Sequence, residues 1–446
     1  MKSGVSIRRR LLPLALAAAG LLHGASASAL TLMQAYEAAL QNDPTYRAAY
    51  QVAQAGKENR ILARSNLLPS LSAAYSINQN RSTVEEYHIR LPEDYLSRSA
   101  TIQVRQPVFS LDALARFKQG KAQADYAEAQ FDSASQDVLM RMLSSYFEVL
   151  FKYDQVAFAK AERDMYAEQR KVNDLLLKRG EGTSTDALET QSRLDLAEAS
   201  VIEAEDALSS ARDTLQSIVG HDVDVTVLDQ LRPGMRVTAD ELLSFEAWRD
   251  KAMELNPDIR TQRKNIEIAR QEINKQRAGH APRVDFVGTY GKTLSDSLST
   301  VNQETTVRSI GFSVNIPIFN GGAVSATTRQ AVANKSKAEA DLDGQIDKVV
   351  IDLRKYYKQM VSSKPKIDAL IKAVDSAQLL ITATQKSIQG GVRINLDLLT
   401  AQRQLSAAQR DLAQARYGYI LALLHVRADA GVLGMDDVRL LAAYFE

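Results

Sequence analysis

The segment Ile316-Pro317-Ile318-Phe319 decides the fold, because it repeats Gln106-Pro107-Val108-Phe109 at a distance of 210 residues. Other landmarks recur at nearly the same distance. Pro44 returns as Pro257 and Pro69 as Pro282, both 213 residues later, and Gly180-x5-Asp186 returns as Gly391-x5-Asp397, 211 residues later. A near-constant offset over several landmarks indicates a tandem duplication, so each half should form one structural unit.

The N-terminus has the three parts of a secretory signal peptide. Lys2 and the arginines at 8–10 form a basic region, residues 11–22 are mostly apolar, and Ala27-Ser28-Ala29 fits a cleavage site. This apolar run is too short to span a bilayer, which takes about 20 residues. We therefore expect residues 1–29 to be removed on export, with an uncleaved anchor as the alternative.

The composition excludes several kinds of site. The chain has no cysteine, hence no disulfide framework, no thiolate metal site and no cysteine that could carry an N-terminal lipid. Its net charge of +1 does not point to nucleic acid. No His-Glu-x-x-His, Gly-x-Ser-x-Gly or P-loop motif occurs, and the histidines are scattered. We expect no enzyme activity, no metal and no cofactor.

Each half contains two segments in which apolar and polar residues alternate, near 70–79 and 99–108, and near 284–293 and 306–317. Such alternation predicts strands. It is typical of transmembrane β-barrels, but a soluble sheet with one wet face fits equally well. No later segment is long and apolar enough for a membrane-spanning helix, so any crossing would be made by strands. The positions expected to face lipid are Leu71, Tyr75, Ile102, Val104, Phe286, Tyr290, Ile310, Phe312 and Val314.

Most of the remaining sequence predicts long helices. Apolar residues step by three and four from Leu111 to Lys178, and roughly 65 helical residues make a rod of about 100 Å. The returning segments, about 185–219 and 394–429, keep a heptad seam in which alanine alternates with larger residues. They are half as long, and a further helix of about 30 residues should precede the first strand of each half. Two short helices stacked end to end would then match one long helix.

Pro365 interrupts the second long helix and has no counterpart in the first half. Because proline inside a helix costs about 3 kcal/mol, we expect a kink or break there. Polar links near 80–98 and 294–305 should form external loops between paired strands. The expected organisation is a signal peptide (1–29), a first repeat (30–219), a linker (220–243), a second repeat (244–430) and a C-terminal tail (431–446).

Four strands per chain require several chains. They cannot close a barrel, and an open sheet edge is not tolerated in lipid. Because closed single-chain barrels have at least about eight strands, two, three or four copies would suffice, and cyclic symmetry is the natural way to close them.

Several motifs together resemble the TolC family of outer-membrane efflux and secretion channels. They are Leu32-Met33-Gln34-Ala35-Tyr36 with Asn42-Asp43-Pro44, Leu67-Leu68-Pro69-Ser70-Leu71, Ile316-Pro317-Ile318-Phe319-Asn320-Gly321-Gly322, and Tyr417-x-Tyr419. The resemblance implies a mainly α chain in a homotrimer, with a twelve-stranded β-barrel in the outer membrane of a Gram-negative bacterium and a twelve-helix α-barrel extending into the periplasm. It also implies a periplasmic adaptor (membrane fusion) protein and an inner-membrane transporter as partners.

The resemblance further places a gate at the periplasmic tips of the helical hairpins. By this resemblance, Thr185 and Asp186 of the first tip bond Arg393 of the second tip, and Asp397 forms a ring in the lumen. The family's second aspartate ring falls on Thr400, so fewer polar links are expected here.

The expected function is that of a passive exit duct in a tripartite system. Without an N-terminal cysteine, the chain looks more like the non-lipidated type I secretion branch, which works with an ABC transporter. The sequence leaves open a drug-efflux channel that serves a proton-driven pump. A soluble periplasmic coiled-coil adaptor is the alternative of a different class, and it would explain the heptads but not the four alternating strands.

Overall fold

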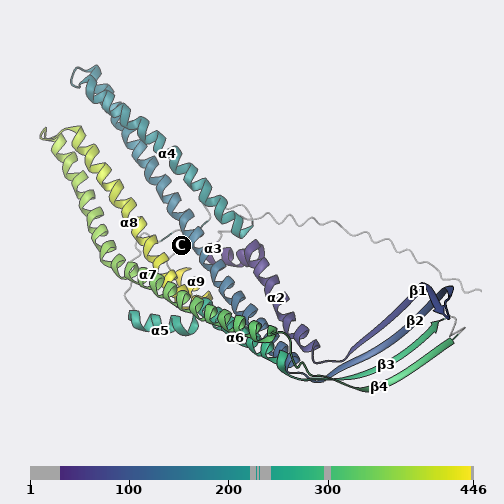
Figure 1. Ribbon diagram of the computed structural model, residues 1–446. Helices are drawn as coiled ribbons and strands as arrows, with labels where there is room; N and C mark the ends of the chain where they lie inside the picture. The colour runs from purple at the N-terminus through teal and green to yellow at the C-terminus, as the bar shows by residue number, and fades with distance from the viewer. Residues whose placement is uncertain (1–30, 221–227, 229–230, 232–242, 296–302, 443–446) are drawn as a thin grey trace, which may run out of the picture.

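The computed structural model describes residues 31–220, 228, 231, 243–295 and 303–442. Two long antiparallel helical hairpins are joined at one end to a single sheet (Figure 1). The helices are α1 (Leu32–Asn42), α2 (Pro44–Ser65), α3 (Leu111–Lys178), α4 (Ser184–Val219), α5 (Phe245–Leu255), α6 (Pro257–Arg277), α7 (Ala323–Gln389), α8 (Asn395–Asp429) and α9 (Met435–Ala442). The strands are β1 (Ser70–Glu86), β2 (Ile89–Phe109), β3 (Arg283–Ser295) and β4 (Gln303–Asn315). The expected signal peptide and most of the expected linker lie outside the described residues.

The helical predictions for the two hairpins are confirmed. Helix α3 has the expected bounds, and the returning helices α4 and α8 begin and end within a residue of the expected ones. Helices α2 and α4 follow one another along α3, as α6 and α8 do along α7 (Figure 1). Of the helices in the described part of the chain, none is both long and apolar enough to cross a membrane.

The four strands form one antiparallel sheet in the order β1-β2-β3-β4. In its register Leu71 lies opposite Val104, and Ile102 lies opposite Tyr290. Because side chains alternate between the two faces of a sheet, all nine positions expected to face lipid share one face. Most of them are exposed in the single chain, Ile310 at 81%. Strands β1 and β4 are the two edges.

The hairpin between β1 and β2 differs from the expectation. The segment 80–98 is not a polar loop, because β1 continues to Glu86 and β2 begins at Ile89. Tyr87 and His88 form the turn with φ of 49° and 67°, as a two-residue type I′ turn requires. Most side chains of these outer strand segments are polar on both faces of the sheet, so no alternation of apolar and polar residues marks them as strands. In the second hairpin β3 continues to Ser295 and β4 begins at Gln303.

Each half begins with two helices rather than the single helix of about 30 residues that was expected. Asp43 caps α2 by accepting a hydrogen bond from Tyr46 N at 2.6 Å. Asn256 caps α6 in the same way, from Ile259 N at 3.0 Å. A proline follows each cap at the first helical position, where no N–H is needed. The cap and the proline together end one helix and start the next.

The two capping residues fasten the repeats differently. Asp43 is buried, and Arg141 Nη2 of α3 lies 3.0 Å from both of its carboxylate oxygens. Asn256 Nδ2 instead donates to the carbonyl oxygen of Asp429 in α8 at 2.9 Å. The first repeat therefore uses an ion pair where the second uses a neutral hydrogen bond.

A kink or a break was expected at Pro365, and the break is wrong, because α7 runs unbroken with the proline inside it. Met360 and Ile367 on either side are fully buried, and each such side chain contributes about 1.5–3 kcal/mol. Ser363 Oγ also donates to Gln359 O at 2.7 Å. Packing thus offsets the cost of the proline, which is about 3 kcal/mol. The ribbon of α7 bends between its two ends (Figure 1).

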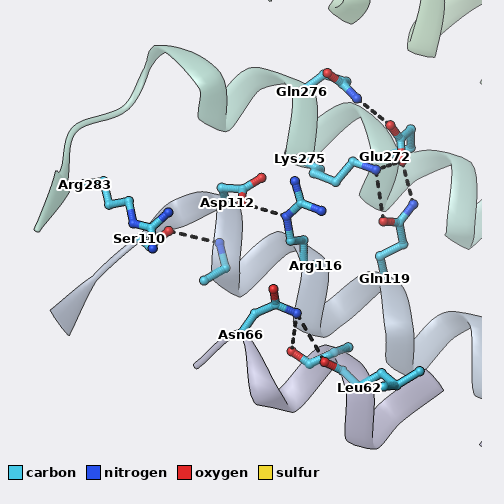
Figure 2. Close-up of polar contacts among 12 residues, drawn as sticks. Leu62, Asn66, Ser110, Asp112, Arg116, Gln119, Glu272, Lys275, Gln276 and Arg283 are labelled. Atoms are coloured by element: carbon cyan, nitrogen blue, oxygen red, sulfur yellow. Dashed lines mark hydrogen bonds and ion pairs between the residues drawn. The ribbon is translucent and has the colours of Figure 1, made fainter. Parts of the chain in front are cut away.

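The junction between helices and sheet is closed by polar contacts (Figure 2). Ser110 begins α3 by accepting from Ala113 N at 3.1 Å. Nine residues further on, Gln119 of α3 donates to Glu272 of α6 at 2.6 Å, and Lys275 pairs with the same carboxylate. These contacts join the long helix of the first repeat to the short helix of the second where the strands begin.

We predict that Asp43→Ala lowers the free energy of unfolding by about 2–4 kcal/mol. The substitution removes the cap of α2 and the partner of Arg141, whose side chain remains partly exposed. Asp43→Asn keeps a capping oxygen and should cost less. Denaturant unfolding followed by circular dichroism measures both.

Asp341→Ala is the control for Asp43, because Asp341 pairs with Lys337 on an exposed helix face and should contribute less than about 1 kcal/mol. Equal losses for Asp43→Asn and Asp43→Ala would show that the cap contributes nothing.

Candidate functional site: the helical tips

Both helical hairpins reverse through the same kind of turn. At the end of α3, Glu181 N donates to Leu176 O at 2.9 Å, and the second tip repeats this bond 211 residues later. Gly180 and Gly391 take φ of 74° and 72°, a left-handed conformation that glycine adopts without strain. The sequence repeat at these glycines thus encodes a geometric repeat.

A cavity of about 280 Å³ lies between the two tips. Asp186 of α4 and Arg393 of the second turn line it together with Ile388. Both charged residues are exposed, and no ion pair joins them in the described part of the chain. The structure therefore brings Asp186 and Arg393 to one cavity without a direct bond.

The other two residues expected at the gate lie elsewhere. Thr185 is exposed in the first turn of α4, next to Asp186, and does not line the cavity. Asp397 is half-buried in the first turn of α8 and also lies outside the lining. A single chain therefore assembles only part of the expected constellation.

The charges around the cavity are unequally paired. Glu181, Asp186 and Glu189 supply carboxylates, and Arg193 and Arg393 supply cations. Arg193 Nη2 lies 2.5 Å from Glu189, and hydrogen bonds with Glu189 and Tyr166 raise the pKa of Arg193. Among the described residues, Arg393 is then the one cation of the lining that has no ion pair, so it is available to a carboxylate nearby or in another copy.

A buried polar network at the first tip was not foreseen. Asn173 Nδ2 of α3 donates to Thr190 Oγ1 of α4 at 2.7 Å, and Gln169 Nε2 donates to Asn173 Oδ1 at 3.1 Å. Thr190 and Gln169 are both buried. A signal did exist, since Thr190 precedes Leu194 by four residues and places a hydroxyl on the apolar seam.

The second tip does not repeat this network. At the equivalent positions it has Thr384, whose buried hydroxyl makes no hydrogen bond within the described residues, and Ala401. Thr183 caps α4 by accepting from Asp186 N at 3.1 Å, whereas its counterpart Ile394 provides no side-chain cap to α8. The first hairpin is therefore tied at its tip by polar bonds that the second lacks.

Comparison with known proteins supports the resemblance. The model of the family described as "Outer membrane efflux protein" matches residues 35–221 and 248–432. The chain is 39% identical to the alkaline protease secretion protein AprF of Pseudomonas aeruginosa, over 98% of this chain and 92% of the relative. It is 36% identical to the proteases secretion protein PrtF of Dickeya chrysanthemi, over 95% of this chain and 93% of that protein.

Solved structures show the same fold. The Campylobacter jejuni CmeC outer membrane channel superposes with a TM-score of 0.78 at 15% identity, covering 93% of this chain and 89% of that one. The outer membrane protein VceC of Vibrio cholerae superposes with a TM-score of 0.75 at 18% identity, covering 90% of this chain and 96% of that one. By family model and by sequence identity, this chain belongs to the outer membrane efflux proteins, a family of outer-membrane channels.

Proposed function

We propose that three copies of this chain form one continuous exit duct, which conducts protein cargo from an inner-membrane ABC transporter and its periplasmic adaptor to the cell exterior. The observation that carries the proposal is the four-stranded sheet, with one apolar face and two open edges. Pairing β4 of one copy with β1 of the next leaves no free edge, as lipid requires. Three copies supply twelve strands, an even number within the range of outer-membrane barrels.

The type of cargo is inferred from AprF and PrtF, whose alignments cover 98% and 95% of this chain. Their names describe secretion of proteases, and both align with nearly the whole of this chain. We therefore assign a secreted protein, rather than a small molecule, to this duct. The absence of cysteine agrees with the non-lipidated secretion branch.

Complementation tests the cargo. The chain is expressed in a P. aeruginosa strain that lacks AprF, and extracellular alkaline protease activity is measured. Restored secretion is expected. Restored drug resistance in a strain lacking its efflux channel, without protease secretion, would instead indicate the drug-efflux role.

We predict that Phe312→Arg prevents trimer assembly, while Ser309→Arg does not. Phe312 is 69% exposed and packs edge-on against Phe286, with ring centroids 5.7 Å apart, on the apolar face. A midplane arginine on a lipid face costs about 2–4 kcal/mol. Ser309 lies on the opposite face of the same strand. Crosslinking of outer-membrane extracts counts the chains in each assembly. Equal yields of trimer for the two variants would contradict the assignment of the faces.

The gate is part of the same proposal. Arg393 bonds Asp186 and Thr185 of an adjacent hairpin when the duct is shut, and three copies of Asp397 form a carboxylate ring in the lumen. Such rings favour cations in narrow pores. The support is the cavity that already gathers Asp186 and Arg393, together with the unpaired state of Arg393 in the single chain.

We predict that Arg393→Ser makes single-channel openings several times more frequent in planar bilayers. Each exposed pair contributes at most about 1 kcal/mol, which corresponds to about fivefold in the gating equilibrium, and the substitution removes the pair from each of the three copies. Arg403→Ser, which removes an exposed cation from the shaft of α8, is the matched control and should leave gating unchanged. Equal opening frequencies in the two variants would exclude Arg393 from the gate.

A further inference from the structure

The apolar face of the sheet ends in a group of cations. Along β4 the outward positions run from Val314 through Phe312 and Ile310 to Arg308. Lys292 on β3 and Arg98 on β2 occupy the same face, one and two rows further from the helices than Arg308. We call Arg98, Lys292 and Arg308 the basic patch.

The three cations are close enough to act together. In the register Lys292 lies opposite Ala100 and Thr306, so it is diagonal both to Arg98 on β2 and to Arg308 on β4. Diagonal neighbours in a sheet are about 7–8 Å apart, within reach of long side chains. Their ends can therefore converge on one anionic group.

The basic patch keeps a surplus of positive charge. Lys292 Nζ pairs with Glu304 at 2.6 Å, and both side chains are about half exposed. Arg308 lies over the ring of Tyr290, with its guanidinium carbon 5.6 Å from the centroid. Arg98 is exposed and makes no ion pair within the described residues. One carboxylate thus faces three cations.

The basic patch lies at the level where the lipid headgroups of a membrane begin. Arg98 lies in the row of Glu304, ten residues along β4 from Val314. This is about 34 Å along the strand, and a tilt of about 35–45° makes it about 25 Å in height, which equals the outward apolar band of such barrels. Tyr75 and Tyr290 lie in the same rows, and tyrosines gather where acyl chains give way to headgroups. The hairpin ends lie away from the helices (Figure 1). With the helices in the periplasm, as the proposed function has them, this level is the outer leaflet.

We propose that the basic patch binds the phosphate groups of an anionic lipid in the outer leaflet of the outer membrane. Arginine offers a planar fork to phosphate oxygens and lysine a compact charge, so the three can hold one phosphate from the side. The aliphatic stems lie along the apolar rows while the charged ends reach the headgroup.

Two other arginines of the first hairpin provide an internal comparison. Arg81 and Arg90 lie further from the apolar rows, and each has its own carboxylate, Asp94 at 3.5 Å and Glu85 at 3.1 Å. They sit beyond the level of the headgroups, and here each cation has a carboxylate, whereas the basic patch has one carboxylate for three cations. Their loss should leave lipid binding unchanged.

The test uses the full trimer in mild detergent, with bisphosphorylated lipid A as the probe and native mass spectrometry as the readout. The parent should bind lipid A in preference to its dephosphorylated form. Arg98→Gln with Lys292→Gln and Arg308→Gln should weaken binding about fivefold per cation, and about a hundredfold together. Arg81→Gln with Arg90→Gln should bind as the parent does.

Each outcome decides the question. Equal binding of the phosphorylated and dephosphorylated lipids by the parent would overturn the proposal without any variant. Unchanged binding by the triple variant, or by Arg98→Gln alone if the triple variant does not assemble, would also overturn it. Displacement of lipid A by millimolar inorganic phosphate would show a site for the free anion rather than for the lipid. Failure of the parent to form trimers would instead count against the proposed function.

Discussion

A backbone N–H or C=O group cannot remain unpaired in lipid, and the architecture of this protein depends on that constraint. Each sheet presents two edges, β1 and β4, whose free polar groups would each cost several kcal/mol in a membrane. Joining edges between copies removes this cost. The number of helical columns equals the number of strands. Each of the four strands continues into one column, and two of the columns are the single helices α3 and α7. The other two are pairs of shorter helices, α2 followed by α4 and α6 followed by α8. A ring of strands can then pass into a ring of helices without a change in number.

The sequence predicted the long elements well because each has a period. Helix α3 and the apolar face of the sheet follow directly from spacings of three, four and two residues. Prediction from the sequence failed where tertiary packing, a helix cap or cross-strand hydrogen bonds outweighed the local residue pattern. At Pro365, burial of Met360 and Ile367 keeps the helix continuous. At Asp43 and Asn256, a single capping side chain divides what the apolar pattern joins. Between Asn80 and Ser97, cross-strand polar bonds form a hairpin that apolar alternation cannot reveal.

The tips were predictable only in part. Resemblance to a family pointed to Asp186 and Arg393, and the structure gathers both around one cavity. The roles proposed for Thr185 and Asp397 would need contacts between copies, which one chain does not contain. The hydrogen bond between Asn173 and Thr190 could not be predicted from the heptad pattern. A hydroxyl on a heptad seam is by itself unfavourable, and its hydrogen-bond partner lies on the facing helix.

The unequal tips have a mechanical consequence. In a ring of three copies the two kinds of hairpin alternate, so polar-tied ends stand between ends that lack those bonds. In the proposed trimer, three hairpin tips cross-linked by polar side chains would alternate with three held mainly by apolar packing. Opening such a ring would cost less at the second kind of tip, so an aperture that widens there first would have threefold rather than sixfold symmetry.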